Sequence, residues 1–529
     1  MDASREPPKC ISMKLGLQST EGVGIDPFPC QSFAPIAERL SMNRWIWLST
    51  FWLMTCLWCP AQADDLPNIV FLLADDLGYG DLGCYGHPYA KTPSIDQLAR
   101  EGTLFRSAYV AGQVCVPSRC GLMTGRFPFT FPVDTATAGF GNAVTVTEKL
   151  KQKGYLTAHF GKWDIGEAVE RGTYGIDEIQ VFERSLGDEL GKDQETVKAA
   201  IDFIRRSQGK PFYMNVWFHS VHAPVRPHSR FVDRFRDLQV RREDFSNPHF
   251  LQRWDDYETD LGDAVGGMKQ YLGELSQLDD QVGRVLAAIR EEGIEQNTIV
   301  LFCSDNGPAL SRSGTPKNST KKNNTRSDQN LLGSAGVLRG TKHSIYEGGV
   351  RVPWIVKWPN RVAAGKVDES SVVAGVDLLP TLSAIAGVQL DDPAIDGEDV
   401  SDIWLGSGRQ RRRDLFWGGP NPRVAVRRDI WKLCWNDDGT EELYDLSTDP
   451  EESNNLVASN AAVASELGVA LEQWILKLPE NRRVGQWLAN LRRKPEKAPP
   501  KPSLKYRPIA GIIVASLLVA AWGWKRSKR

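Results

Sequence analysis

The sequence predicts an α/β fold in which a mostly parallel sheet is covered by helices on both faces. Four short apolar runs have the length and composition of buried strands, and they occupy residues 68–74, 155–161, 212–218 and 298–304. Apolar residues with helical spacing lie between these runs, as in residues 278–293. Strands that alternate with helices in this way are typical of a parallel sheet buried on both faces.

The size and charge of the chain narrow the class of protein. Its 529 residues are enough for two domains, and 41% of them are hydrophobic, as in ordinary globular proteins. The 64 Lys and Arg residues nearly balance the 66 Asp and Glu residues, so the formal net charge is -2. This balance argues against a general nucleic-acid binder held by phosphate contacts. We therefore expect no nucleic-acid partner, and any recognition of anions must be local.

The N-terminal residues 1–63 are predicted to be an extension followed by a signal peptide. An apolar run over residues 45–58 follows a basic residue and precedes small residues at 61–63, which is the pattern of a cleaved secretory signal. The mature chain would then begin at Asp64 and be exported to the periplasm, the cell surface or the medium. A buried helix is the alternative interpretation of the apolar run.

The C-terminal end has two segments of unusual composition. Residues 488–507 form a Pro/Lys-rich linker, and residues 508–529 form an apolar segment that ends in a basic tail. The apolar part is near the lower length limit for spanning a bilayer, and its basic tail would stay on the cytoplasmic side. We expect an anchor that attaches the protein to a membrane, or a sorting segment. A buried terminal helix is the alternative.

Two cysteines lie five positions apart in residues 112–126, "GQVCVPSRCGLMTGR". Taken alone, this segment permits a disulfide between Cys115 and Cys120, a metal-binding loop or a catalytic nucleophile. The mature chain would hold five cysteines, so at least one of them must be free, modified or paired with another chain.

Oxygen ligands follow two of the predicted strands. Asp75 and Asp76 come directly after the first apolar run, and Asp305 and Asn306 follow the fourth. The carboxyl ends of parallel strands meet at one edge of a sheet, so these side chains are expected to lie together. Three carboxylates would repel one another without a cation, and Ca²⁺ or Mg²⁺ prefers such ligands. Each pair taken singly also has the composition of an ordinary turn.

Six segments together carry a family resemblance. In their order and spacing they resemble the formylglycine-dependent, arylsulfatase-like sulfatases of the alkaline-phosphatase-like superfamily, over roughly residues 64–487. The segments are "LLADDLGYGDLGCYG", "CVPSRCGLMTGR", "GKWDIG", "SVHAPV", "CSDNG" and "KHSIYEGGVRVP".

This resemblance implies how the chain is divided. We expect a catalytic domain at residues 64–388 with the alkaline-phosphatase-like sheet, and a C-terminal subdomain at 389–487. The subdomain would be a small antiparallel sheet packed on a helix, and residues 427–456 have the pattern of its hairpin, with a turn at 436–439. Residues 376–388 have the apolar spacing of a helix.

The resemblance also implies a reaction. In this family, the cysteine that corresponds to Cys115 is oxidised to formylglycine by a separate maturation enzyme. Its hydrated aldehyde attacks sulfur, and its second hydroxyl later helps to expel sulfate, which a serine could not do. The implied substrate is a sulfated carbohydrate or an aryl sulfate.

Other roles carry over residue by residue. Asp75, Asp76, Asp305 and Asn306 resemble the ligands of Ca²⁺, which is favoured over Mg²⁺, with the modified Cys115 as a further ligand. Arg119 resembles the arginine that steadies the formylglycine hydroxyl, and Lys162 and Lys342 resemble the lysines that bind sulfate oxygens. His222 resembles the histidine that donates a proton to the leaving-group oxygen. Without the family resemblance, Lys162 and Lys342 would be predicted to lie on the surface. His219 would then compete with His222 for the role of proton donor.

One residue departs from the family pattern. The family usually has histidine where this sequence has Asp164, and that histidine assists the elimination of sulfate. An aspartate can still accept a proton there, but it adds negative charge beside an anionic ester. We therefore expect Asp164 to be in the site and to alter activity, substrate type or pH optimum.

The sequence also fits two other functional classes. The same superfamily includes phosphate and phosphonate ester hydrolases, and a non-catalytic binder of sulfated glycans is a third class. A polar, basic insertion at residues 311–330 is a hypothetical attractor of polyanionic glycans through Lys317, Lys321, Lys322 and Arg326, although it equally fits a solvated loop.

Overall fold

The computed structural model describes residues 66–483 except 167–168, 184–188, 208, 310–331 and 419–422. The predictions for the signal peptide, the linker, the apolar C-terminal segment and the basic insertion all concern residues outside this described part. Within it, no helix combines the length and the apolar character needed to cross a membrane.

The main sheet has eight strands, and the four predicted strands lie side by side in it. Neighbouring strands pair in parallel, except that β7 runs antiparallel to both β6 and β2. The prediction of a mostly parallel sheet is therefore confirmed. In spatial order the strands are β4 (Glu178–Gln180), β3 (Leu156–Gly161), β5 (Phe212–Trp217), β1 (Asn68–Ala74), β6 (Thr298–Ser304), β7 (Trp354–Lys357), β2 (Thr103–Tyr109) and β8 (Lys366–Ala374).

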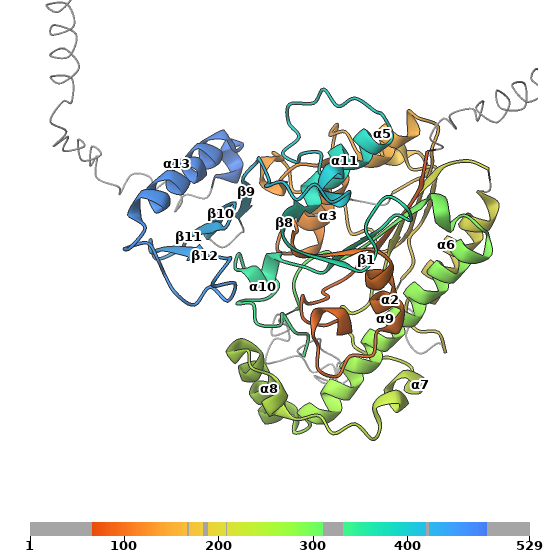
Figure 1. Cartoon of the computed structure of the whole chain (residues 1–529), viewed down its shortest axis with the longest axis horizontal. Helices are drawn as coiled ribbons and strands as arrows, with labels where there is room; N and C mark the ends of the chain where they lie inside the picture. Colours follow the sequence, from red (N-terminus) through yellow and green to blue (C-terminus); the bar gives the residue numbers. More distant parts are fainter. Residues whose placement is uncertain are drawn as a thin grey trace, which may run out of the picture. The chain divides into compact units, whose positions relative to one another are not determined.

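Both faces of this sheet are buried. Side chains alternate along β1, so that Val70 and Leu72 join one hydrophobic core while Ile69 and Phe71 join the other. The first core is completed by α2 (Pro93–Glu101), α6 (Gln194–Arg206) and α9 (Ala264–Glu291). The second is completed by α3 (Cys115–Thr124), α5 (Val146–Lys151) and α11 (Leu378–Ile385). Figure 1 shows the two groups of helices on opposite faces of the sheet.

The remaining helices are shorter or lie outside these two layers. They are α4 (Thr135–Ala138), α7 (Ser229–Val232), α8 (Pro248–Leu261), α10 (Glu347–Val350), α12 (Ser401–Trp404) and α13 (Ala461–Lys477). The predicted helix at 376–388 corresponds to α11, and the helical pattern at 278–293 lies within α9.

The second sheet is the small antiparallel one that the sequence predicts. Its strands lie in the order β12 (Glu441–Asp445), β11 (Trp431–Trp435), β10 (Val424–Arg428) and β9 (Leu415–Gly418). One face packs on α13, and the other packs against residues of β2 and α10, as alternating side chains require. The hairpin turn lies at the predicted place, since the amide of Gly439 donates to the carbonyl of Asn436 at 3.1 Å.

The carboxyl ends of four parallel strands bring distant loops together. Ala74 pairs in register with Ser304, Leu73 pairs with Trp217, and Trp217 pairs with Gly161. The residues that follow these positions therefore begin at one edge of the sheet, where parallel sheets hold their functional groups.

A buried histidine beneath this edge leads to a prediction about acid stability. The ring of His159 lies 4.8 Å from the rings of both Trp163 and Trp217, and burial, aided by the charge of Arg119, lowers its pKa to about 3. The unfolded chain binds a proton there near pH 6.5 and the folded chain does not. The stability that depends on a neutral His159 is therefore present above pH 6.5 and is lost as the pH falls from 6.5 towards 3.

We expect His159→Phe to flatten this dependence. As the pH falls from 6 to 4, the free energy of unfolding of the parent should decrease by up to about 1.4 kcal/mol more per pH unit than that of the variant. Denaturant unfolding at several pH values measures the difference, and parallel curves for the two proteins would contradict it.

Candidate active site

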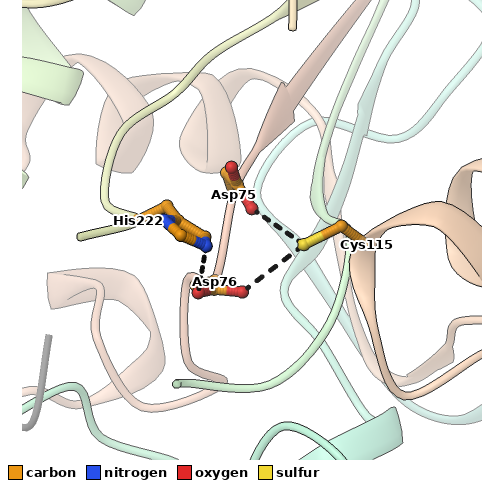
Figure 2. Close-up of side chains that lie close together, drawn as sticks. All are labelled: Asp75, Asp76, Cys115 and His222. Atoms are coloured by element: carbon orange, nitrogen blue, oxygen red, sulfur yellow. Dashed lines mark hydrogen bonds and ion pairs between the residues drawn. The ribbon is translucent and has the colours of Figure 1, made fainter. Parts of the chain in front are cut away.

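Cys115 begins α3 at the edge where the loops converge. Its Sγ lies 3.3 Å from Oδ1 of Asp75 and 3.8 Å from Oδ1 of Asp76. Dashed lines in Figure 2 mark both contacts. The chain is tightly packed just before the helix, where a Cβ on Gly112 would come within 2.6 Å of the Pro117 side chain. A larger residue at position 112 would therefore displace the start of α3.

The two cysteines of this segment are not partners. Cys115 and Cys120 are both free thiols, so the disulfide interpretation is wrong. Cys120 lies fully buried in the hydrophobic core beneath α3. Cys115 alone faces the charged groups, and the ligands around it include carboxylate oxygens rather than a second sulfur.

Two lysines are buried against the carboxylates. Nζ of Lys162 lies 2.6 Å from Oδ2 of Asp75, and Nζ of Lys342 lies 2.6 Å from Oδ1 of Asp76. Lys342 also donates to Sγ of Cys115 at 3.2 Å. Their side chains are only 2% and 11% exposed, so the surface interpretation of both lysines is wrong.

Arg119 lies one helical turn after Cys115 and is fully buried. Its Nε and Nη2 donate to Oδ2 of Asp305 at 3.1 and 2.8 Å, and its Nη1 donates to the carbonyl of Lys162 at 3.0 Å. The guanidinium lies over the ring of Trp217 at 4.9 Å. Trp217 is not among the residues predicted for the site, although its place at the end of a predicted strand could have pointed to it.

Asp305 and Asn306 reach Asp76 from the end of β6. Oδ1 of Asp305 accepts from the amide of Asp76 at 3.1 Å, and Nδ2 of Asn306 donates to Oδ1 of Asp76 at 2.8 Å. Asp76 itself has a φ of 61°, in the left-handed region that residues other than glycine rarely adopt. Such strain is typical of functional sites.

Of the two candidate histidines, His222 is the one in the site. Its Nε2 lies 3.6 Å from Oδ2 of Asp76, and its Nδ1 lies 2.8 Å from the carbonyl oxygen of Ala223. His219 instead points its Nε2 to the carbonyl of Phe182 at 2.8 Å.

Asp164 lies at the margin of the same cluster. Its Oδ2 is 2.8 Å from Nζ of Lys162, and its side chain is 45% exposed. Burial opposes its charge, but Lys162 outweighs this effect and lowers the pKa of Asp164. The structure thus brings together all ten residues that the sequence analysis assigned to the site.

The charges in the cluster alter one another's ionisation. Burial raises the pKa of Asp305 to about 6, and the nearby charge of Asp75 adds to this effect. Burial opposes the charge of Lys162 and of Lys342, but the negative groups around them raise the pKa of both. The two lysines therefore stay charged, and they can bind an anion.

The residues present fit a hard cation. Oδ2 of Asp76 and Oδ1 of Asn306 are buried, and neither accepts a hydrogen bond from the residues that the structure describes. Ligand atoms of Asp75, Asp76, Cys115 and His222 lie within 4.8 Å of one another. Asp305 is not one of these four, and its two oxygens accept hydrogen bonds from Arg119 and from the Asp76 amide. Buried oxygens without a donor are what a bound Ca²⁺ or Mg²⁺ would satisfy.

Comparison with known proteins identifies this arrangement. The Sulfatase family model matches residues 67–388, and the model of the C-terminal part of N-sulphoglucosamine sulphohydrolase matches residues 340–478. Arylsulfatase A of Homo sapiens is 34% identical over 461 residues, which cover 77% of this chain and 86% of that protein. N-acetylgalactosamine-6-O-sulfatase of Bacteroides thetaiotaomicron is 26% identical over 78% of this chain and 93% of that protein.

Solved structures share the fold. That of Ps i-CgsB in complex with k-i-k-neocarrahexaose has a TM-score of 0.64 at 23% identity, and the match covers 81% of this chain and 97% of that one. The PsFucS1 sulfatase from Pseudoalteromonas sp. has a TM-score of 0.60 at 22% identity, with 84% and 95% covered.

The sheet, the charged cluster at its carboxyl edge and these matches define an α/β enzyme of the alkaline-phosphatase-like superfamily. More narrowly, the chain belongs to the sulfatase family, and it is an enzyme that hydrolyses sulfate esters. Recognition of the family from its six segments is thus confirmed.

Proposed function

We propose that this enzyme removes sulfate from a sulfated carbohydrate or an aryl sulfate, with formylglycine made from Cys115 as its nucleophile. The observation that carries the proposal is the position of Cys115. Its thiol is free of any disulfide and lies at the start of a helix, 3.3 Å from Asp75 and 3.2 Å from Lys342. An anion bound by the lysines would lie against this side chain.

The unmodified thiol suits this role poorly. Burial raises the pKa of Cys115 well above its usual value, and the charges of Asp305 and Asp75 raise it further. Little thiolate would be present, and the thiolate is the reactive form of cysteine. Oxidation to the aldehyde by a maturation enzyme removes this obstacle, since the hydrate offers one hydroxyl to attack sulfur and a second to help expel sulfate.

The surrounding cations are proposed to stabilise the charge that develops on sulfate. Lys162 and Lys342 hold their charge and lie beside Cys115 and the two aspartates. Arg119 is held rigidly by Asp305 and by the Lys162 carbonyl, one turn after Cys115, where it steadies the nucleophilic hydroxyl. Fixed positive groups in a buried site stabilise a transition state strongly because they need not reorganise.

His222 is the proposed proton donor to the leaving oxygen. Its Nδ1 faces the carbonyl oxygen of Ala223 at 2.8 Å, so this nitrogen must carry a hydrogen. Nε2 can then donate a proton only when the ring is an imidazolium. A general acid at this point matters because an alkoxide leaves poorly.

Asp164 is the proposed base for the elimination of sulfate. Its carboxylate is held by Lys162 and is partly exposed, so it can accept a proton and exchange it with solvent. The lowered pKa of Asp164 keeps it ionised and ready to accept. If Asp164→Ala left turnover unchanged, this assignment would be wrong.

Sugar sulfates are the favoured substrate class. A relative named N-acetylgalactosamine-6-O-sulfatase matches most of the chain, and a similar fold is known in complex with a neocarrahexaose. Release of sulfate from N-acetylgalactosamine 6-sulfate and from 4-nitrophenyl sulfate tests the proposal, with Cys115→Ala as the blank. The proposal would be contradicted if the enzyme released sulfate from neither of these compounds and from no sulfated polysaccharide.

Export is part of the proposal. The pattern of residues 45–63 is that of a cleaved signal peptide, and the apolar segment at 508–529 would attach the protein to a membrane. Both segments lie outside the described residues.

Calcium is the proposed metal, held by Asp75, Asp76, Asp305 and Asn306 with residue 115 as a further ligand. When bound, it would supply positive charge beside the sulfate oxygens. We expect removal of metal with a chelator to abolish turnover, and Ca²⁺ to restore it better than Mg²⁺.

A second readout of metal binding does not depend on activity. Ca²⁺ at about one hundred times its dissociation constant should raise the free energy of unfolding by about 2.7 kcal/mol. Asn306→Ala should reduce this gain, because it removes a buried oxygen that accepts no hydrogen bond within the described part of the chain. Full turnover by the metal-free protein would contradict the assignment.

A further inference from the structure

The loop that carries His222 is held from behind by a buried lysine. This loop follows β5, and its carbonyl groups at His222 and Pro224 accept hydrogen bonds from Nζ of Lys192 at 3.0 and 2.9 Å. Lys192 lies in the turn before α6, far from the loop in sequence. None of the family segments quoted above contains it.

Lys192 is fully committed to this contact. Its side chain is 1% exposed, and its third hydrogen-bond partner is Oε1 of Glu274 on α9, at 2.5 Å. An ammonium group has three hydrogens to donate, so each has an acceptor. Lysine is almost never buried unless paired, and a buried pair by itself is weak evidence for stability. A role in holding the loop that carries His222 would explain why Lys192 and Glu274 form this buried ion pair.

The neighbouring residue holds the same loop by its amides. Oδ1 of Asp193 accepts from the amide of His219 at 2.6 Å, and Oδ2 accepts from the amide of Ser220 at 3.1 Å. Glu274 also accepts from Oγ of Ser220 at 3.1 Å. The loop is therefore fixed on both sides of His222, and the His222 side chain projects from it towards Asp76.

We propose that Lys192 is a positioning residue for His222, which fixes where the imidazole lies relative to the leaving-group oxygen. This inference rests on the proposed role of His222. When the S–O bond breaks, its electron pair stays with the leaving oxygen, and the Nε2 proton of the imidazolium goes to that oxygen. A displaced loop would leave this proton out of reach, while the nucleophile and the lysines at the sulfate would be unaffected.

The dependence on the leaving group tests the proposal. Aryl sulfates from 4-nitrophenyl to phenyl sulfate differ in how much they need a proton donor, since nitrophenolate leaves without one. We expect Lys192→Met to lower kcat/KM on phenyl sulfate about tenfold more than on 4-nitrophenyl sulfate, which is part of the roughly 10²–10⁴-fold that a general acid typically contributes. His222→Ala should show the same imbalance, at about a hundredfold.

Controls separate this effect from a loss of structure. Lys357→Met removes another buried lysine, whose Nζ lies 2.6 Å from Glu101 and from Glu295, and which pairs with the first half of β6 away from the site. It should lower kcat/KM equally on both esters, or not at all. Asp193→Asn keeps the side-chain volume, and it should show a smaller imbalance in the same direction even if Lys192→Met does not fold.

The possible outcomes are distinguishable. If His222→Ala shows the imbalance and neither Lys192→Met nor Asp193→Asn does, the positioning role is wrong and the proposed function stands. If His222→Ala shows no imbalance, the proposed role of His222 itself is wrong.

Discussion

Cys115→Ser is expected to lower steady-state turnover of sulfate esters by about 10⁴-fold or more, as loss of a nucleophile typically does. A serine hydroxyl beside Lys342 and Asp75 could still attack sulfur, because the cations that stabilise the transition state remain. It has no second hydroxyl with which to expel sulfate. The variant should therefore become sulfated once and then stop.

Two measurements check this expectation. Turnover is measured by release of 4-nitrophenol from its sulfate ester, and the peptide that contains residue 115 is weighed by mass spectrometry for one added sulfuryl group. Cys120→Ala is the matched control, because this cysteine lies on the same helix but points into the core. It should keep turnover within a few fold. A Cys115→Ser enzyme that turns over at the parent rate would contradict the account.

Lys432→Met is expected to destabilise the protein by about 3–5 kcal/mol, the range found when one partner of a buried ion pair is removed. Lys432 lies on β11 with no exposed side-chain surface, and its Nζ is 2.9 Å from both Glu347 and Glu452. Glu347 begins α10, where Tyr109 donates to it at 2.6 Å. Methionine would leave two buried carboxylates without the cation between them.

Denaturant unfolding measures this loss. Lys198→Met is the control, since Lys198 is 66% exposed and only 4.0 Å from Glu195, so its removal should change stability by less than about 1 kcal/mol. The double variant Lys432→Met with Glu452→Gln should recover part of the loss, because one uncompensated charge is removed. Equal stability of the parent and Lys432→Met would contradict the stabilising role of this buried lysine.

Four adjacent strands of the main sheet could be predicted from the sequence, and the other four could not. The runs that form β1, β3, β5 and β6 are continuous and apolar because both faces of each strand are buried. β8 exposes the side chains of Val367, Glu369 and Ser370, and β7 has only four residues, so neither shows a clear pattern. The antiparallel direction of β7 depends on the loops around it, which local spacing does not reveal.

The site was predictable because its residues lie in short motifs, each beside a strand or helix end. The rule that parallel strands end at one edge placed Asp75 and Asp305 near one another, and the family resemblance added Cys115 to them. Spacing could not show that Lys162 and Lys342 are buried against carboxylates, since lysines look alike in sequence wherever they lie. Lys192 was missed for the same reason, because its contacts with the His222 loop exist only in the folded chain.

The central claim is that residue 115 acts as formylglycine rather than as cysteine. The mass of the peptide that spans residues 112–126, taken from protein purified from the native host, tests this most directly. We predict the aldehyde, alone or as its hydrate. An unmodified thiol in protein that is fully active as a sulfatase would contradict the account.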